Sequence, residues 1–406
     1  MNERDHPGPH LERWLERHHD DLISLRRHLH AHPELSGQEH ATTRLIGDRL
    51  LQAGLEPRVL SSGTGVICDV GDPPSPARRP PVIALRADMD ALAMADEKDV
   101  AYRSRVPGVA HACGHDVHTT VVLATGLFLA QLDPLMPCRV RLIFQPAEER
   151  VPGGALDVIA DGGLDHVDAV FGVHCDPKLD VGRIGLRAGA ITSAADMAVI
   201  TLSGPGGHTA RPERTVDLVG LTARMISELA ERVESHLDGS GPIKLVFGAV
   251  HGGDAANVIP SRTELRASVR TSSNEAWDLL PAAVEKAAGE VVAGTGATCS
   301  LDYTHGVPGV VNDPTLVDVV RAAAHRTRPP ISVTDAEHSW GGDDFAWYSR
   351  QVPGALIRLG TRDPASPEPP LDLHAGCFDA DERAIAVAVR LLVAVTREQA
   401  ARRGGP

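Results

Sequence analysis

Residues 111–118 read HACGHDVH and lead straight into an apolar run that is long enough to form a helix. Cys113 and His115 are two positions apart, so on a helix their side chains would point to different faces. We therefore expect them in a loop that feeds a helix at 116–132, with Asp116 at or near its cap. The helix dipole favours a thiolate at that end, and thiolates bind zinc-like metals strongly. Two such residues alone also fit a buried free cysteine beside polar histidines.

Composition narrows the class of protein. The chain has 406 residues, which corresponds to two or three domains at about 150 residues each. Hydrophobic residues make up 42% of the chain, enough for a large core, and predict a globular protein. The net charge of −14, from 40 basic and 54 acidic residues, argues against nucleic acids and anionic membranes as main partners.

Three features bear on cellular location. The stretch MNERDHPGPHLERW at the start is charged and has no apolar core, so it does not resemble a signal peptide. The most apolar run, VVLATGLFLAQL, is shorter than the ~20 residues that cross a bilayer. Six cysteines occur without any CxxC pair, which indicates free thiols in a reducing compartment. We expect a cytoplasmic protein.

The N-terminal part predicts two helices. Apolar residues between Leu11 and Leu29 follow helical spacing, and Pro33 ends the pattern. Ser36 followed by Glu39 matches a capping box for a second helix. Several histidines of the first helix are expected on its solvated face. They are His18, His19, His28 and His30.

Short strand-like runs then alternate with helices. We expect strands at 82–88, 139–145 and 169–174, and helices at 116–132 and 154–161. This alternation is typical of a parallel sheet that is covered on both faces. In such sheets, ligands bind just beyond the carboxyl ends of the strands.

Ligand-type side chains follow each of these strands. The first strand ends in Asp88, the second runs into the acidic pair Glu148–Glu149, and the third ends in His174. The cysteine–histidine loop lies between the first two strands, so carboxylates and imidazoles are expected at one edge of the sheet. His111 and His118 are expected to support this site or to pack, and packing is favoured for His118 because it lies on the helix.

The pattern changes near residue 189. From there to about 306 the sequence predicts alternating strands with helices at 214–237 and 274–292, which indicates an inserted α+β domain with an antiparallel sheet. The parallel pattern then resumes and ends with a helix near 380–402. The predicted architecture is a discontinuous α/β domain with an insertion. Its parts are 1–188 and 307–406 for the α/β domain and 189–306 for the insertion.

The candidate metal ligands exceed the number that one metal needs. A single catalytic zinc normally takes three protein ligands, whereas five suit two metals about 3.5–4 Å apart that share a carboxylate or thiolate and a water. One glutamate of the acidic pair would bind metal while its neighbour accepts the water's proton as general base. A surface acidic pair is the alternative, but this pair follows an apolar strand. The candidate ligands are Cys113, His115, Glu149, His174 and His374.

Other residues fit structural roles equally well. The turn GPGGH ends in His208, and no GK[ST] follows it, so it is not a phosphate loop. Asn257 fits the end of a loop before a strand, and Arg270 fits an ordinary ion-pair partner on a strand. The segment WGGDDF, 340–345, fits a chain turn ahead of a short helix.

These segments together resemble the metal-dependent aminoacylases, in the branch of the hippurate hydrolases and indole-acetyl-amino-acid hydrolases. The similar motifs follow the family's order from about residue 20 to about residue 395. They are RADMDAL (86–92), HACGHDVHTT (111–120), QPAEE (145–149), GVH (172–174), GPGGHTARP (204–212), ANVIP (256–260), GGDDF (341–345) and LHAGCF (373–378).

The resemblance implies a fold and a cofactor. It implies a zinc-aminopeptidase-like catalytic domain with a largely parallel central sheet, interrupted by a lid domain that often mediates homodimerisation. It implies two divalent metal ions per subunit, held by the five candidate ligands, with Glu148 as general base. Zn²⁺ or Mn²⁺ is expected, and Co²⁺ or Ni²⁺ is also compatible with these ligands.

Further roles follow from the resemblance. Asp88 matches a residue that orients a metal ligand from behind, and Asp116 is expected to orient or cap. His208 matches a lid histidine that stabilises the oxyanion, often from the partner subunit. Asn257 and Arg270 match lid positions that contact substrate, Arg270 through the substrate's carboxylate.

The expected reaction is hydrolysis of N-acyl-L-amino acids, hippurate-like or with other aryl-acyl groups, to a carboxylate and an amino acid. A dipeptidase or carboxypeptidase on the same dinuclear scaffold is the nearest alternative, and a non-catalytic ligand-binding relative is a more distant one. Three departures from the family pattern flank the expected pocket, so the sequence leaves the acyl group and the amino acid open. They are Arg150 after QPAEE, Glu213 after Pro212, and GGDDF in place of GGEDF.

Overall fold

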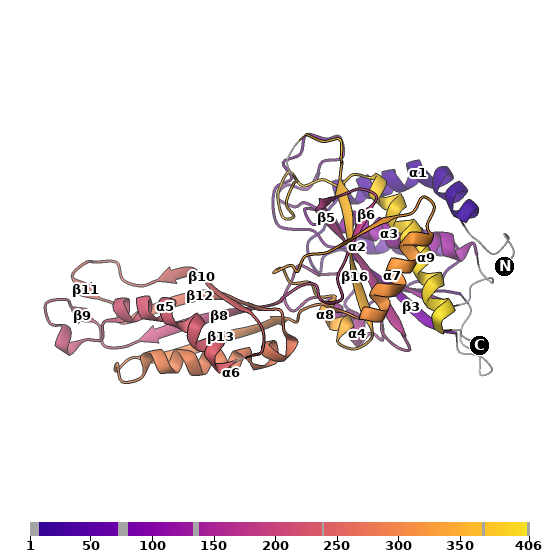
Figure 1. The fold of residues 1–406 in the computed structure, drawn as a ribbon. Coiled ribbons are helices and arrows are strands. Elements are labelled where there is room, and N and C mark those ends of the chain that lie inside the picture. The colour runs from indigo at the N-terminus through magenta and orange to yellow at the C-terminus, as the bar shows by residue number, and fades with distance from the viewer. Residues whose placement is uncertain (1–7, 72–79, 133–137, 238, 368–369, 404–406) are drawn as a thin grey trace. The chain divides into compact units, whose positions relative to one another are not determined.

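The computed structural model describes residues 8–71, 80–132, 138–237, 239–367 and 370–403 (Figure 1). They form two compact units, which are described separately. Unit 1 contains Met1–Ile191, Val311–Glu337 and Asp344–Pro406. Unit 2 contains Thr192–Val310 and His338–Asp343.

Unit 1 is built on an eight-stranded mixed sheet. Its central strands β4, β3, β5 and β16 run parallel, while β2 pairs with β4 and β6 pairs with β16 in antiparallel fashion. The predicted α/β fold with a largely parallel sheet is thereby confirmed. In spatial order the strands are β1 (Arg58–Val59), β2 (Val66–Val70), β4 (Arg139–Gln145), β3 (Val82–Asp88), β5 (Ala169–Asp180), β16 (Gly354–Arg362), β6 (Arg183–Leu186) and β15 (Ser332–Asp335).

Helices cover this sheet, and a short two-stranded ladder, β7 (Gly189–Ala190) with β14 (Val311–Asn312), lies beside it. Figure 1 shows α7 and α9 running side by side. The described helices of unit 1 are α1 (Gly8–Ala31), α2 (His40–Gln52), α3 (His115–Ala130), α4 (Ala155–Ala160), α7 (Pro314–Arg326), α8 (Ala346–Ser349) and α9 (Arg383–Arg403).

The alternation of side chains along β3 positions the polar residues. Leu85 and Ala87 belong to the apolar core that residues of α1, α3, α7 and α9 also form. Because successive side chains of a strand point to opposite faces, Arg86 and Asp88 lie on the other face of the sheet. The same alternation on β5 puts Val173 in the core and His174 on the face of Asp88.

Unit 2 is a separate α+β body. Its antiparallel sheet has the order β10-β12-β8-β13, and every second residue of β8 is buried, as expected for a sheet with one covered face. Helices α5 and α6 pack against each other and against strands of the sheet. The elements are β8 (Ala194–Ser203), β9 (Gly207–His208), a 3-10 turn at Pro212–Arg214, α5 (Leu218–His236), β10 (Ile243–His251), β11 (Val258–Ile259), β12 (Arg262–Thr271), α6 (Asn274–Val292) and β13 (Thr298–Val307).

Two local predictions for the N-terminal part are wrong. Helix α2 begins at His40 without a side-chain cap, and the Ser36 hydroxyl donates instead to Asp90 at 2.6 Å. His30 is fully buried rather than solvated, because its ring bonds to Asp116.

Within the described residues, no helix has both the length and the apolar character needed to cross a membrane.

Candidate metal centre

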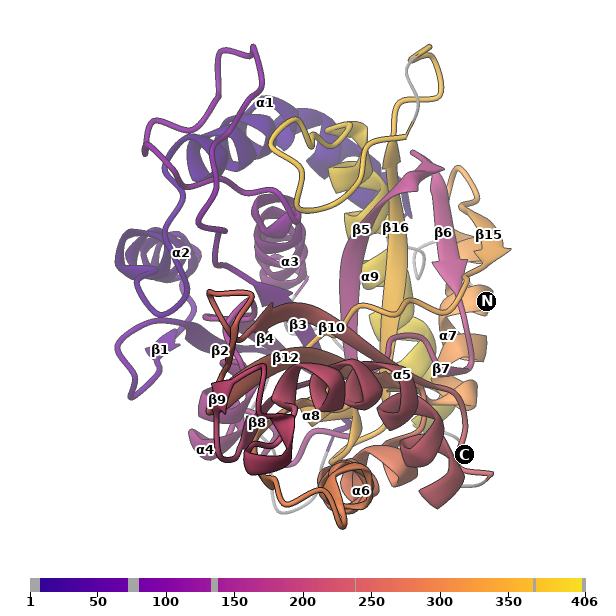
Figure 2. The same cartoon turned by 90° about the vertical axis from the view of Figure 1, so that its left-hand side faces the viewer.

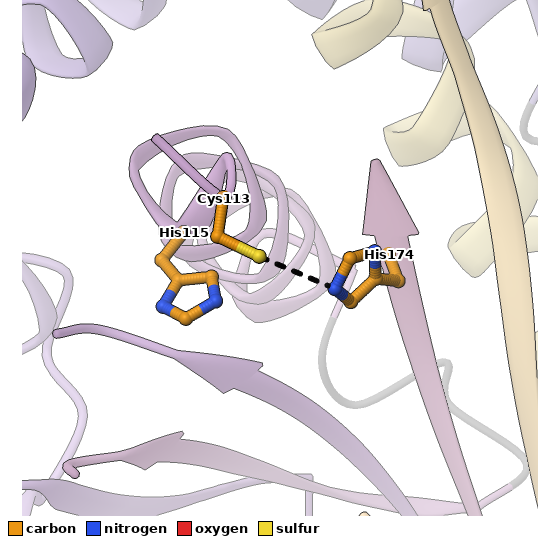
Figure 3. Close-up of side chains that lie close together, drawn as sticks. All are labelled: Cys113, His115 and His174. Atoms are coloured by element: carbon orange, nitrogen blue, oxygen red, sulfur yellow. Dashed lines mark hydrogen bonds between the residues drawn. The ribbon is translucent and has the colours of Figure 1, made fainter. Parts of the chain in front are cut away.

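Cys113, His115 and His174 converge where β5 meets the start of α3 (Figure 3). Cys113 Sγ lies 3.6 Å from His174 Nε2. The other ring nitrogen of His174 donates to the carbonyl of Cys175 at 2.9 Å, so the lone pair of Nε2 faces the Cys113 sulfur. His115 is oriented in the same way, since its Nδ1 lies 2.9 Å from the carbonyl of Asp90.

Glu148, Glu149 and His374 complete a second cluster that shares His115. His115 Nε2 lies 3.9 Å from Glu148 Oε2 and 3.9 Å from Glu149 Oε1. Glu149 Oε1 is also 3.2 Å from His374 Nε2. His374 is the most accessible of these side chains, with 53% of its surface exposed. All six predicted residues, five ligands and one base, therefore lie in one neighbourhood.

The donor set fits divalent metals. Cys113, His115 and His174 each offer a ligand atom within 4.8 Å of the others, and so do Cys113, Glu149 and His374. His115 Nε2 is buried and has no hydrogen-bond partner among the described residues. A buried nitrogen lone pair that faces carboxylates is costly unless a cation or proton fills the gap. One sulfur, three imidazoles and a carboxylate are ligands that zinc, manganese, cobalt and nickel accept.

Electrostatics differ among the candidate ligands. Burial opposes the charge on His115, but the Asp88 carboxylate and other neighbours outweigh it and hold its pKa well above the ordinary value. A hydrogen bond from His374 to Glu149 raises the pKa of His374. Burial lowers the pKa of His174, and the nearby charge of Arg358 lowers it further. Burial raises the pKa of the Cys113 thiol, so the helix dipole alone does not make it a thiolate; a bound metal would release these protons.

Gly114 permits the close spacing of the first two ligands. It is the residue before α3 and has φ of 89°, a conformation that favours glycine. A Cβ added there would lie 2.6 Å from the Sγ of Cys175. Asp116 lies in the first turn of α3, two positions after the N-cap residue Gly114.

Asp88 anchors the site from behind. Its Oδ1 accepts from His118 Nδ1 at 2.6 Å, and its Oδ2 accepts from Arg86 at 2.5 Å. His118 Nε2 accepts from the backbone N–H of Cys175 at 2.8 Å, which fixes the proton on Nδ1. His118, predicted to pack, is therefore a buried link between Asp88 and the strand that carries His174.

A second layer of this network involves residues to which the sequence motifs assigned no role of their own. Arg86 donates to Gln145 at 2.8 Å and to Asp344 at 2.7 Å. The Gln145 amide donates to Asp344 at 2.7 Å, and the Tyr348 hydroxyl donates to Gln145 at 2.9 Å. These side chains are buried, so the ends of β3 and β4 are fixed relative to each other.

Asp116 is held by α1. Arg26 Nε lies 2.8 Å from Asp116 Oδ2, and His30 Nδ1 lies 2.7 Å from the same oxygen. Burial opposes ionisation of Asp116, but the Arg26 and His30 charges outweigh it and keep its pKa well below the ordinary value. Asp116 therefore attaches the start of α3 to α1, and its orienting role at the metal centre stays a prediction.

The loop with the acidic pair is supported by two further carboxylates. Asp90 Oδ2 accepts from the backbone N–H of Glu149 at 3.0 Å. Glu39, fully buried, accepts from the backbone N–H of Ala147 at 2.8 Å. Ala147 has φ of 54°, so the backbone turns sharply just before Glu148. In the sequence, Ser36 and Glu39 stood out only as a candidate helix cap. In the structure their polar side chains bond to Asp90 and to the backbone of Ala147 instead.

The predicted lid residues lie in unit 2. His208 is exposed on β9, where it pairs with Val258 of β11. Asn257 is exposed in the turn just before β11. Arg270, on β12, donates to Ser268 Oγ at 3.2 Å and to the carbonyl of Trp340 at 2.5 Å.

Comparison with known proteins adds independent information. A family model described as peptidase family M20/M25/M40 matches residues 84–398. N-acetylcysteine deacetylase of Bacillus subtilis is 36% identical over 371 residues, which cover 91% of this chain and 94% of that protein. A Rhodococcus jostii protein that carries the name of a glutamate–cysteine ligase is 44% identical over 376 residues, or 93% of this chain. The chain spans only 46% of that relative's length.

Solved structures are also similar to this chain in sequence and fold. The Bacillus subtilis YXEP protein, described as a dinuclear metal binding peptidase, superposes with a TM-score of 0.81 at 33% identity. The match covers 94% of this chain and 98% of that chain.

Proposed function

Because this chain belongs to peptidase family M20/M25/M40, we propose that it is a metal-dependent amidohydrolase that cleaves N-acyl-L-amino acids to a carboxylate and an amino acid. The observation that carries the proposal is the convergence of Cys113, His115, Glu149 and His174 with the Glu148 carboxylate at one end of the parallel strands. Every candidate ligand and the candidate base are present, which disfavours a non-catalytic relative.

We propose that two divalent cations bind these ligands, with His374 completing the set. When bound, such cations lower the pKa of a coordinated water from 15.7 to about 7 and polarise the substrate carbonyl. Zn²⁺ suits the thiolate, and Mn²⁺, Co²⁺ or Ni²⁺ suits the imidazoles and carboxylate. The unpartnered Nε2 of His115 supports this assignment, because Nδ1 is already engaged with the Asp90 carbonyl.

The chain's own residues would perform the proton transfers. Glu148 accepts a proton from the attacking water and delivers it to the leaving nitrogen, so one carboxylate acts as base and then as acid. Asp88 holds His118 in place, and the Asp90 carbonyl orients the ring of His115, which supports the geometry without touching the substrate. We assign oxyanion stabilisation to His208, from the same or a partner subunit, because its imidazole is exposed at a strand end.

The first substrate class to test is N-acylated cysteine. One relative, which this chain matches over 94% of its length, is named N-acetylcysteine deacetylase. Hippurate-like substrates with aryl-acyl groups are the second class, because the sequence motifs resemble those of hippurate hydrolases. We further propose that unit 2 serves as a lid, with Asn257 and Arg270 facing the substrate, and that the protein forms homodimers through this unit. We also propose that the protein is cytoplasmic, because its cysteines are free thiols.

A substrate panel tests the proposal. The protein is stripped with chelator, reloaded with Zn²⁺ or Mn²⁺, and assayed on N-acetyl-L-cysteine, hippurate and a set of dipeptides. We expect amino acid release from the acylated amino acids, abolished by chelator. Cleavage of dipeptides with no activity on acylated amino acids would instead establish a dipeptidase or carboxypeptidase.

A further inference from the structure

Arg358 lies beside His174 in the sheet of unit 1. The two residues are register partners on the parallel strands β16 and β5, and Figure 2 shows β16 between β5 and β6. Ile357 and Leu359, the neighbours of Arg358 on β16, belong to the apolar core. Because side chains alternate along a strand, Arg358 leaves the sheet on the opposite face, which is the face of His174.

The Arg358 side chain has no polar partner in the part of the chain that the structure describes. It is half-buried, yet no ion pair or hydrogen bond engages its guanidinium, which carries five N–H donors. Its partner in register on the other side, in β6, is Gly185. A Cβ at Gly185 would lie 3.2 Å from the Cβ of Arg358 and 3.2 Å from Cδ1 of Leu179, so a larger residue there would crowd the base of the arginine side chain.

The position of this charge is unfavourable unless an anion joins it. A guanidinium one strand from a candidate ligand of divalent cations is repelled when those cations bind. A partly desolvated cation without a counter-ion adds to the cost. Arg362, four residues further along β16, avoids this cost because it lies 3.6 Å from the Asp180 carboxylate.

We propose that Arg358 binds the α-carboxylate of the N-acyl-amino acid and thereby selects free-acid substrates. The inference rests on the proposed function and adds a binding residue within unit 1. Neighbouring strands are only about 4.8 Å apart, so an arginine side chain can reach a group held next to His174. The planar guanidinium matches a carboxylate with two parallel hydrogen bonds. Arg270 already uses two of its nitrogens for hydrogen bonds within unit 2, so Arg358 adds donors that Arg270 alone does not offer.

The test compares an acid with its neutral amide. Wild type, Arg358→Met, Arg358→Lys and the matched control Arg362→Met are loaded with Zn²⁺ and assayed on N-acetyl-L-cysteine and on N-acetyl-L-cysteinamide. Any binding of the substrate thiol to metal is common to both compounds and cancels in their ratio. We expect Arg358→Met to lower kcat/KM for the acid about 10- to 100-fold, mainly through KM, and to leave the amide nearly unchanged.

The remaining variants separate a specific contact from a structural one. Arg358→Lys should recover part of the loss, and Arg362→Met should keep the wild-type ratio of acid to amide. An equal loss on both compounds, or no loss on either, would overturn the proposal. So would a wild-type protein that does not distinguish acid from amide.

A binding measurement works without turnover. Calorimetry of N-acetyl-L-cysteine and its amide on Zn²⁺-loaded Glu148→Gln protein, with and without Arg358→Met, should show the loss of affinity for the acid alone. If wild type hydrolyses neither compound, the proposed function fails for this substrate class. The calorimetric comparison then still decides whether Arg358 holds a carboxylate, and equal affinities with and without Arg358→Met would reject it.

Discussion

Arg86 donates to Asp344 at 2.7 Å, although 258 residues separate the two in the sequence. Asp344 is the first residue of the last segment of unit 1, so this contact fixes the point at which the chain returns to the α/β sheet. Both side chains are almost fully buried. Arg86 also holds Asp88, so the returning segment is coupled to the residue that lies behind the candidate metal ligands.

Asp344→Asn should lower the free energy of unfolding by about 3 kcal/mol, because removing one partner of a buried ion pair leaves the other charge uncompensated. Urea denaturation measures the change. Asp69→Asn is a suitable control, since Asp69 pairs with Arg141 at a partly exposed site and should contribute about 1 kcal/mol or less. Equal losses of unfolding free energy in the two variants would show that the buried Arg86–Asp344 ion pair contributes no more to stability than a partly exposed one.

Glu148→Gln should abolish most turnover while leaving metal binding intact. General base catalysis contributes about 100- to 10,000-fold, and the amide cannot accept the water's proton. Metal analysis and kcat on the same preparation make the comparison. Wild-type activity in the variant would show that another group is the base.

Cys113→Ser should reduce the metal content below that of wild type. The hydroxyl is a weaker ligand than the thiolate, and the site loses the sulfur that faces His174. Metal-to-protein ratios after gel filtration measure the effect, with Cys68→Ser as control because Cys68 is buried elsewhere in the sheet. Full occupancy in the Cys113 variant would exclude a ligand role.

Glu39→Ala should impair turnover although Glu39 is not a candidate ligand. Its loss leaves the backbone N–H of Ala147 without an acceptor and loosens the sharp turn before Glu148. Losses of supporting contacts at metal sites are typically about 10- to 100-fold in metal affinity or activity. Glu39→Gln keeps an acceptor oxygen, so its activity should be closer to wild type; if both variants matched wild type, the turn would not depend on this contact.

Asp96 should make stability depend on pH in acid. Burial opposes its ionisation, but donors from Lys98 and Ser104 outweigh this and lower its pKa to about 2. A depressed carboxyl pKa stabilises the fold above the unfolded-state pKa of about 4, and the stabilisation is lost as pH falls towards 2. The difference in unfolding free energy between wild type and Asp96→Asn should be at most about 2 kcal/mol at pH 7 and shrink between pH 4 and pH 2. A difference that does not change over this range would assign the effect to packing alone.

The sequence predicted the strands and the residues that follow them because parallel strands carry strong local signals. Runs such as VIALR and RVRLIF predict buried strands, and polar residues just beyond them must meet at one edge. Arg86 and Gln145 stand in the quoted motifs RADMDAL and QPAEE, but neither was assigned a role, because nothing in the local sequence shows what they contact. Their partners Asp344 and Tyr348 come from the far end of the chain, and single-sequence periodicity contains no information on such pairing.

Local motifs misled where tertiary partners competed for the same side chains. Ser36 and Glu39 have the spacing of a capping box, but Asp90 and the backbone N–H of Ala147 take their hydrogen bonds. His30 shares α1 with solvated histidines, yet it faces Asp116. Helical spacing shows which residues share a face of a helix. It does not show which faces are buried until the elements that pack against the helix are known.

Gly114 has a consequence for how this sequence can change over time. Its positive φ and the Cys175 sulfur next to it are two separate barriers to any side chain at this position. A smaller residue at position 175 would remove the steric barrier but not the conformational one, so no single compensating substitution opens the path. Glycine is therefore the only residue that position 114, between Cys113 and His115, readily accepts. A saturation library at Gly114 should return almost only glycine among functional clones.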